Sequence, residues 1–314
     1  MNIKSTLRSL CITAVVFVFT SSVSWAAATE CTEKKVGTGV KTAKIAVASN
    51  FFTAAKDLVT AFQKTTAGAN TAITICENST THLLAEIKNG TELPPSVFPT
   101  DPGFPRYNLF LAANAAAPNS LQSSTGTISY TYAIGIPVFF GLRTKVPTVG
   151  DLITGLGSGY SATITASTSE LSPYAVNKVT APYVALAGTG APYGVMSHTI
   201  LNAMEGTHIP SVLPSWVYST LFANIDLTYD AVIAGTGGIR SGFVSKGQIC
   251  GQLGSVTYVE FTDSTCELDQ KAILLKKSNG SPNATAAALN NYIQGRITNG
   301  TWDTFLSAHC YGTF

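Results

Sequence analysis

Charged residues are scarce in this chain. Asp, Glu, Lys and Arg make up 11% of the 314 residues, and the formal net charge is +2. An average soluble protein has about 25% charged residues. A protein that binds nucleic acid or an anionic membrane electrostatically needs a basic surface, and this composition does not supply one. We therefore expect no nucleic-acid partner and a surface rich in Ser, Thr, Asn and Gly.

Common catalytic and cofactor motifs are also missing. The glycine-rich stretches 188–190 and 235–238 lack the third glycine of a dinucleotide fingerprint, and no glycine loop runs into the Lys-Ser/Thr of a P-loop. No serine lies in a G-x-S-x-G turn, and no Cys/His spacing indicates zinc. Asp226 and Asp230, four residues apart, are typical of a solvated helix face. We expect neither an enzyme nor a cofactor or metal site.

No stretch after the start of the chain is long and apolar enough to span a membrane. The apolar run Leu10 to Phe19, broken by Thr13, follows the cationic Lys4 and Arg8. Small residues come next, which is typical of a cleavable secretory signal. The run is shorter than the roughly 20 residues that cross a bilayer. We expect residues 1–28 to be a signal peptide cleaved near Ala26-Ala28, leaving a neutral, soluble protein outside the cytoplasm.

Cysteine is sparse, and five of the six cysteines lie outside the predicted signal. After residue 28 the chain has Cys31, Cys76, Cys250, Cys266 and Cys310. In an oxidising compartment, cysteines normally pair. Cys250 and Cys266 flank a strand-like stretch and could close a local loop. One of the other three thiols would then remain free, and the spacing does not say which.

Two strand-to-helix units follow one another early in the chain. The segment 44–48 is typical of a short buried strand, and Ser49-Asn50 leads from it into a helix with apolar residues at helical spacing through Phe62. The segment 72–76 predicts a second strand. Asn78 to Thr81 is a polar helix start, before a short helix that stops at Asn89-Gly90. This succession favours a parallel α/β sheet.

The rest of the chain continues the alternation of strands and helices. Further strands are predicted over 109–112, 130–142, 162–166, 241–244 and 271–275. Helices are predicted from near Ser197, over 225–233, over 285–297 and over 302–308. The long apolar run 130–142 predicts a crossing from one domain to another.

The two helix starts after the first strands are candidates for binding an anion. Ser49-Asn50 and Ser79-Thr80 lie at the carboxyl edge of the sheet, where open α/β sheets bind ligands. A helix start offers unpaired N–H groups and a partial positive charge, so hydroxyl and amide side chains there hold an anion without Lys or Arg. The same residues are also the preferred N-caps, and ordinary capping is the competing interpretation.

Several sequence blocks occur in an order that indicates a family. They are Ile45–Phe51, Asn78–Gly90, Leu109–Asn114 with Pro118, Thr131–Gly135, Ala191–Gly194, Gly242–Val244, Lys271–Lys276 and Tyr311-Gly312. Together they span about residues 43 to 313. In order and spacing they resemble the periplasmic molybdate-binding proteins of ABC importers.

This resemblance implies an α/β, two-lobed type 2 periplasmic-binding-protein fold, in which each lobe is a mostly parallel sheet flanked by helices. Lobe 1 would comprise residues 41–130 plus 250–314, and lobe 2 residues 131–249. The implied function is capture of molybdate, tungstate or a similar tetrahedral oxyanion in the periplasm for an inner-membrane ABC permease. The implied protein is a monomer without a cofactor.

The resemblance also implies a set of ligand-binding residues. Ser49, Asn50, Ser79 and Thr80 would come from lobe 1, and all four are already candidates from their position at the helix starts. Lobe 2 would contribute Tyr193 and the helix start near Ile225. Tyr174 competes with Tyr193 for the same role, because Ser172-Pro173-Tyr174 precedes a second Pro-Tyr pair.

The sequence departs from the family pattern at three places. Glu77 precedes the second hydroxyl pair, where relatives usually have glycines, and a carboxylate there repels an anion unless it points away. Insertions occupy 91–107 and the stretch 167–190 before Ala191. These departures leave two alternatives: the same fold binding another small organic anion, or an exported interaction or structural protein whose cleft is blocked by the insertions.

Overall fold

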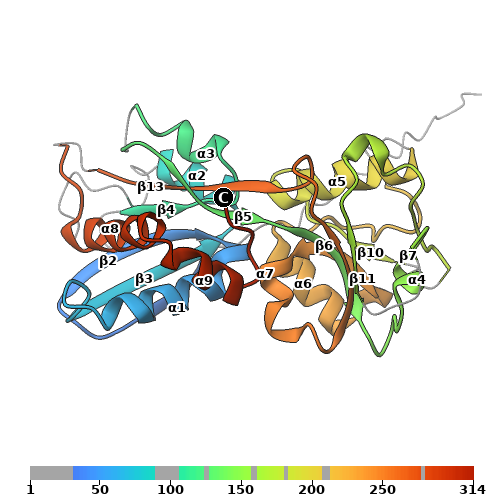
Figure 1. The fold of residues 1–314 in the computed structure, drawn as a ribbon, viewed down its shortest axis with the longest axis horizontal. Coiled ribbons are helices and arrows are strands. Elements are labelled where there is room, and N and C mark those ends of the chain that lie inside the picture. The colour runs from blue at the N-terminus through green and yellow to red at the C-terminus, as the bar shows by residue number, and fades with distance from the viewer. Residues whose placement is uncertain are drawn as a thin grey trace, which may run out of the picture.

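A computed structural model describes residues 31–88, 106–123, 127–156, 161–179, 183–206, 213–276 and 280–314. The predicted signal peptide and most of the insertion 91–107 lie outside these residues. Two helix-covered sheets lie side by side along the long axis of the molecule (Figure 1). Within the described ranges, no helix has the length and apolar character needed to cross a bilayer.

The first sheet has the strand order β1-β3-β2-β4-β13-β5. Its strands are β1 (Thr32–Val36), β2 (Lys41–Ala48), β3 (Thr71–Asn78), β4 (Leu109–Leu111), β5 (Tyr130–Gly135) and β13 (Leu268–Leu274). β2 pairs in parallel with β3 and β4, whereas β1 and β13 pair antiparallel with their neighbours. The sequence did not predict β1, because its exposed residues show no alternation of apolar and polar side chains.

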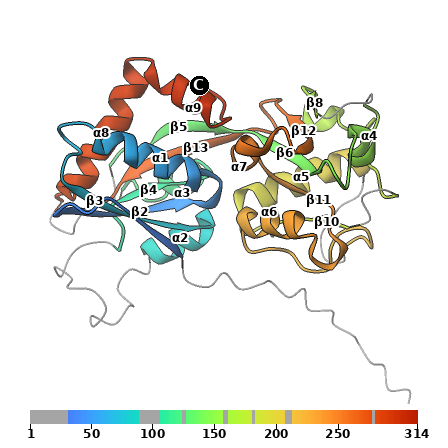
Figure 2. The same ribbon diagram turned by 90° about the horizontal axis from the view of Figure 1, so that it is seen from below.

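Helices cover both faces of this sheet. They are α1 (Phe52–Gln63), entered through the 3₁₀ turn η1 (Ser49–Phe51), α2 (Thr80–Lys88), α3 (Ala116–Asn119), α8 (Ala284–Thr298) and α9 (Thr301–Ala308). Side chains alternate along β2, so Ile45 and Val47 pack with α1, α8 and α9. Ala46 packs on the opposite face, in the cluster that includes α2 and α3 (Figure 2). The predicted helices on this lobe are confirmed.

The second sheet has the strand order β10-β11-β6-β12-β8. Its strands are β6 (Pro137–Leu142), β8 (Ser161–Ile164), β10 (Val184–Ala185), β11 (Ser241–Ser245) and β12 (Val256–Phe261), and a separate pair is formed by β7 (Ile153–Thr154) and β9 (Ala175–Val176). Its helices and 3₁₀ turns are α4 (Val149–Leu152), η2 (Thr168–Glu170), α5 (Pro192–Glu205), α6 (Ile225–Ala234), η3 (Thr236–Gly238), α7 (Lys246–Ile249) and η4 (Cys250–Gln252). Helix α5 begins before the expected Ser197, because a proline is well tolerated in the first helical turn.

The chain crosses between the sheets twice. The first crossing joins β5 to β6 at Ile136, within the run that predicted it. The second joins β12 to β13. Since β12 pairs with β6, it belongs to the second sheet, and the chain returns to lobe 1 after Phe261 rather than at residue 250. Residues 131–135 likewise belong to the first sheet, so the expected limits of lobe 2 move towards the C-terminus.

The disulfides differ from the expectation. Cys31 pairs with Cys76, and Cys250 pairs with Cys310, with Cα–Cα distances of 5.4 and 5.6 Å. Cys266 is the free thiol, so the predicted local loop between Cys250 and Cys266 is wrong. Cys266 points into the apolar core of lobe 2, whereas Cys250 faces the end of α9. The second disulfide therefore ties the two lobes together.

Candidate anion site between the two lobes

A small cavity lies where the two lobes meet. It is lined by Ala48, Ser49, Asn50, Ser79, Thr80 and Ala113 from lobe 1, and by Ala191, Pro192, Tyr193, Asn224 and Ile225 from lobe 2. The six residues predicted from sequence are all among them. The space open to the centre of a water-sized sphere is about 10 Å³, roughly what one ordered water needs. The lobes are therefore closed on this site.

Four helix starts among the described residues converge on the cavity. Ser49 opens the turn into α1, and Ser79-Thr80 opens α2, each after a parallel strand of the first sheet. From the second lobe come the starts of α5, at Pro192, and α6, at Ile225. Each start carries a partial positive charge and N–H groups without partners inside the helix. Their convergence favours a bound anion.

Two of these starts lack a side-chain cap. The residues in the cap position before η1 and α5 are Ala48 and Ala191, and neither accepts a hydrogen bond through its side chain. The other two starts are capped: Asn224 Oδ1 accepts from Leu227 N at 2.9 Å, and Ser79 Oγ accepts from His82 N at 3.2 Å. Ordinary capping therefore accounts for Ser79 but not for Ser49. At η1 and α5 no cap side chain competes with a ligand for the backbone donors.

Polar side-chain atoms at the cavity are incompletely bonded. Ser49 Oγ and Asn50 Oδ1 are buried and have no hydrogen-bond partner within the described part of the chain. Thr80 Oγ1 accepts from Ala113 N at 2.9 Å, which leaves its own proton free to donate. A buried hydroxyl without a partner is destabilising. The Ser49 hydroxyl is therefore poised to donate to a ligand.

Behind the cavity, a buried polar network joins the lobes. Asn50 Nδ2 donates to Gln270 Oε1 at 2.9 Å, and Gln270 Nε2 donates to the Tyr193 hydroxyl at 3.0 Å. The Tyr193 hydroxyl in turn donates to Ser245 Oγ at 3.1 Å, and the Tyr311 hydroxyl donates to the Asn50 carbonyl. Burial raises the pKa of Tyr193 well above its ordinary value, so it stays protonated. Asn50 and Tyr193 thus use these groups to hold the lobes together.

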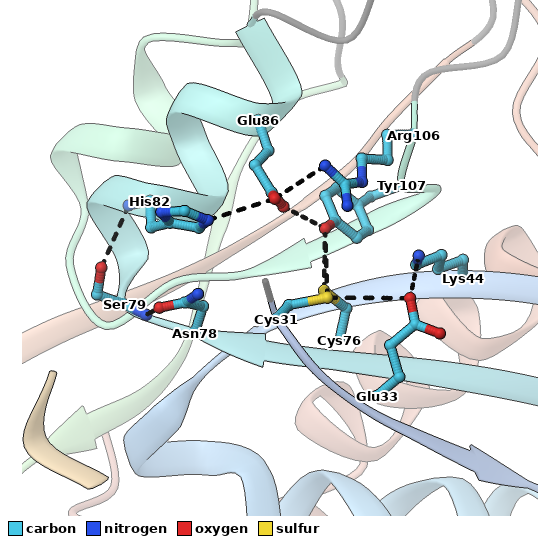
Figure 3. The surroundings of a disulfide bond; sticks show 10 residues. All are labelled: Cys31, Glu33, Lys44, Cys76, Asn78, Ser79, His82, Glu86, Arg106 and Tyr107. Carbon is cyan, nitrogen blue, oxygen red and sulfur yellow. Dashed lines mark hydrogen bonds and ion pairs between the residues drawn. A yellow bond between two sulfur atoms is a disulfide. The ribbon is translucent and has the colours of Figure 1, made fainter. Parts of the chain in front are cut away.

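Figure 3 shows how the start of α2 is anchored on its outer side. Asn78 Oδ1 accepts from Ser79 N at 2.7 Å, which fixes the turn between β3 and the helix. Two turns further on, Glu86 forms an ion pair with Arg106 at 2.8 Å and accepts from the Tyr107 hydroxyl. Tyr107 lies against the Cys31–Cys76 disulfide. These contacts hold the helix start in place relative to the sheet.

Glu77 lies beside the site but does not line the cavity. Its side chain is 4% exposed, and its Oε1 has no hydrogen-bond partner in the described ranges. Burial raises the pKa of Glu77 to about 7, the nearby Asp226 and Asp230 raise it further, and the neighbouring Ser49 and Thr32 hydroxyls lower it. Glu77 therefore points neither into the cavity nor into solvent.

Several other predictions have a definite outcome. Tyr174 packs against the core of lobe 2 and does not reach the cavity, so it is not the ligand-facing tyrosine. Asp230 is exposed as expected, whereas Asp226 is half-buried, and burial raises its pKa. The stretch 235–238 is a turn, with positive φ at three of its glycines. Over the described ranges, no cluster of His, Cys, Asp and Glu could hold a metal ion.

Sequence reasoning missed some residues of the site. Asn224 precedes a predicted helix and is a favoured N-cap, so the same argument that found Ser79 could have found it. Gln270 gave no signal, and Tyr311 was noted as part of a family block but not as a site residue, because they reach Asn50 across 220 and 261 residues of sequence.

Comparisons with known proteins were made at the level of sequence and of structure. No family model and no curated protein sequence matches the chain. The substrate-binding domain assigned to a molybdenum ABC transporter of Clostridium difficile is similar in structure, with a TM-score of 0.51, 12% identity and coverage of 87% of this chain and 99% of that one. The tungstate-binding protein TupA of Desulfovibrio alaskensis G20 has a TM-score of 0.50, 13% identity and coverage of 83% and 93%.

These similarities decide the fold. The chain has the type 2 periplasmic-binding-protein fold. The expected α/β, two-lobed class is confirmed, with both sheets containing parallel pairs. The regulatory domain of CcmR from Synechocystis PCC6803, in complex with 2-PG, is also similar, with a TM-score of 0.50, 10% identity and coverage of 81% and 96%. Because binding proteins and a regulator share this fold, the function has to be argued from the site.

Proposed function

We propose that this protein is a periplasmic substrate-binding protein that captures molybdate, tungstate or a similar tetrahedral oxyanion for an ABC importer. In this proposal it is exported by residues 1–28, acts as a monomer without catalysing a reaction, and delivers its ligand to an inner-membrane permease. The proposal agrees with the two oxyanion-transport proteins that share the fold.

The observation that carries the proposal is the convergence of uncapped helix starts on the cavity between the lobes. The starts of η1 and α5 have no side-chain cap, and the Ser49 hydroxyl has no hydrogen-bond partner among the described residues. Among the described residues, no lysine or arginine lines the cavity, so an anion would be held there by neutral donors. Fixed neutral donors in a closed cavity select ligands by size and geometry.

Binding would proceed by closure of the lobes. The four helix starts come from both lobes, so an anion contacts all of them only when the lobes are together. A ligand shifts such an equilibrium by as much as its affinity for the two states differs. A tetrahedral oxyanion is larger than the present cavity, so we expect the closed, ligand-bound lobes to stand slightly further apart.

The blocked-cleft alternative receives no support from the described part of the second insertion. Residues 167–179 and 183–190 pack on lobe 2, with Leu171 and Val176 in its core. None of these residues lines the cavity. An organic anion remains the second candidate, because a small carboxylate also suits a cavity lined by helix starts and hydroxyl groups.

The proposal is tested by ligand-induced stabilisation. Residues 29–314, freed of bound ions by unfolding, dialysis and refolding, are heated with molybdate, tungstate, sulfate, phosphate and a panel of small carboxylates. A ligand at 100 times its Kd adds about 2.7 kcal/mol to the free energy of unfolding, which is visible as a raised Tm. Stabilisation by the carboxylates alone would favour the second candidate. No stabilisation by any anion would contradict both.

A further inference from the structure

Glu77 occupies an unusual place for a carboxyl group. It is the residue before the turn that starts α2, and it lies in β3 opposite Thr32 of β1 and Val47 of β2. Its side chain is 4% exposed, and Oε1 has no partner among the described residues. A buried carboxylate without compensating donors is strongly disfavoured relative to the neutral acid.

The groups around Glu77 add to its preference for the protonated form. Asp226 and Asp230, on α6 of the other lobe, raise the pKa of Glu77 further by electrostatic repulsion. The facing groups on β1 and η1 are the neutral hydroxyls of Thr32 and Ser49, and Val47 on β2 is apolar. The positive charge of Lys56, on α1, lowers the pKa of Asp226.

Ser49 connects Glu77 to the cavity. Its hydroxyl lowers the pKa of Glu77 more than the Thr32 hydroxyl does, and Ser49 also lines the cavity. Within the described residues, Ser49 Oγ completes no hydrogen bond. A hydroxyl has one proton to donate and two lone pairs. An ionised Glu77 would accept a hydrogen bond from the Ser49 hydroxyl, which would leave only the lone pairs of Ser49 Oγ facing the ligand. A protonated Glu77 would donate to Ser49 Oγ and leave the Ser49 proton for the ligand.

We propose that Glu77 is the proton-linked determinant of anion binding in this protein: capture of an oxyanion requires a protonated Glu77, and loss of that proton to solvent favours release. The inference rests on the proposed function of the same cavity. The charge balance supports it, because a dianion and a carboxylate would otherwise lie close together in a site without cations.

The size of the effect follows from the protonated fraction. With a pKa of about 7, Glu77 is mostly protonated at pH 6 and mostly ionised at pH 8. If only the protonated form binds, the apparent Kd is divided by that fraction and rises about tenfold between these pH values. Molybdate and sulfate stay fully ionised over this range, so their own titration does not contribute.

The test is calorimetric titration with molybdate, or with sulfate if molybdate does not bind, at pH 6, 7 and 8. Each pH is measured in two buffers that differ in ionisation enthalpy, which gives the number of protons taken up. Wild type should bind about tenfold more weakly at pH 8 than at pH 6 and take up close to one proton per anion at pH 8. Glu77→Gln, which is neutral at every pH, should show neither effect and should bind more tightly than wild type at pH 8.

Two further variants test whether the pH dependence of the Kd arises at Glu77. Glu170→Gln makes the same charge change at an exposed site on lobe 2 and should keep the pH dependence of wild type. Asp226→Asn removes a negative charge that faces Glu77, so the pH midpoint should move down. A Kd that does not change with pH in wild type, or a pH dependence that persists in Glu77→Gln, would overturn the inference while leaving the proposed function intact. Absence of anion binding at every pH in all variants would overturn the proposed function and this inference with it.

Discussion

Ser49 is the residue on which the binding proposal can be tested with the least disturbance of the fold. Its Oγ is buried and makes no hydrogen bond within the described residues, so Ser49→Ala removes no completed hydrogen bond of the protein. We expect the free energy of unfolding to stay unchanged or rise slightly, since an unsatisfied hydroxyl is lost. The affinity for the anion should fall by about 10- to 150-fold, because a hydrogen bond to a charged group contributes about 1.5–3 kcal/mol.

This prediction is checked by chemical unfolding and by titration with the best ligand of the panel. Ser307→Ala, at an exposed position of α9, is the matched control and should change neither quantity. A large loss of stability in Ser49→Ala with unchanged affinity would show that the hydroxyl serves the fold and not the ligand.

Glu77 also predicts how the stability of the ligand-free protein depends on pH. Its pKa is raised from 4.5 to about 7 in the folded protein, so folding favours the protonated form. The stabilisation is complete below the pKa of the unfolded chain and is lost as the pH rises through the pKa of the folded protein. Between pH 4.5 and about 7, Glu77 should therefore lower the free energy of unfolding by about 3 kcal/mol, with little further change above.

The measurement compares urea unfolding of wild type and Glu77→Gln across pH 4.5 to 8 without any anion. The difference between the two free energies should shift in favour of the glutamine variant as the pH rises. A difference that does not vary with pH would mean that Glu77 ionises normally in the folded protein. The experiment needs no ligand, so it tests Glu77 independently of the binding proposal.

At the scale of elements, the site depends on how closely α5 approaches its neighbouring loop. A Cβ added at Gly194, in the first turn of α5, would lie 2.0 Å from the Gly188 carbonyl oxygen. Gly194→Ala should therefore push the start of α5 away from the cavity. We expect the free energy of unfolding to fall by about 1–3 kcal/mol. The affinity for the anion should fall by more than it does when a single side-chain contact is removed.

The control for this prediction is another helical glycine. Gly295 lies on the exposed side of α8, and a Cβ added there meets nothing within 4 Å. Gly295→Ala should stabilise the protein by up to about 1 kcal/mol without changing anion affinity. Thermal unfolding and calorimetric titration of both variants check the pair. Equal changes in Tm and in anion affinity for the two variants would contradict the proposed role of the α5 start.

At the scale of the whole molecule, the two disulfides have different tasks. Cys31–Cys76 closes 45 residues within lobe 1, and Cys250–Cys310 closes 60 residues and links lobe 2 to lobe 1. In the chain-entropy description each contributes about 4 kcal/mol at most, so their removal should cost similar stability. Only removal of the Cys250–Cys310 disulfide should allow the lobes to open further.

Paired Cys→Ser variants test this difference. Small-angle X-ray scattering of the anion-free protein should show a larger radius of gyration for the Cys250/Cys310 variant than for wild type. The Cys31/Cys76 variant, which is the matched control, should keep the wild-type value as long as it is folded. Equal radii in all three proteins would show that the second disulfide does not limit opening.

Much of the architecture was predictable because it is encoded over short distances in the chain. The apolar spacing in 44–62 specified a strand and then a helix, and Ser49 and Ser79 marked the strand-to-helix turns. The carboxyl ends of parallel strands meet at one edge of a sheet, so these two turns could be placed together from the sequence alone. The resemblance to a known family added Tyr193 and Ile225, which the structure places at the same cavity.

Other features were decided by contacts between residues that are distant in sequence. The partner of Cys250 depends on where α9 ends, and the network around Asn50 depends on β13 and the C-terminal segment. The protonation of Glu77 depends on its burial and on two aspartates of the other lobe. Thus local periodicity and capping determined the elements and their helix starts. The tertiary structure alone determined the disulfide pairing, the closure of the lobes and the charge state beside the cavity, because burial and long-range pairing exist only once the lobes are packed.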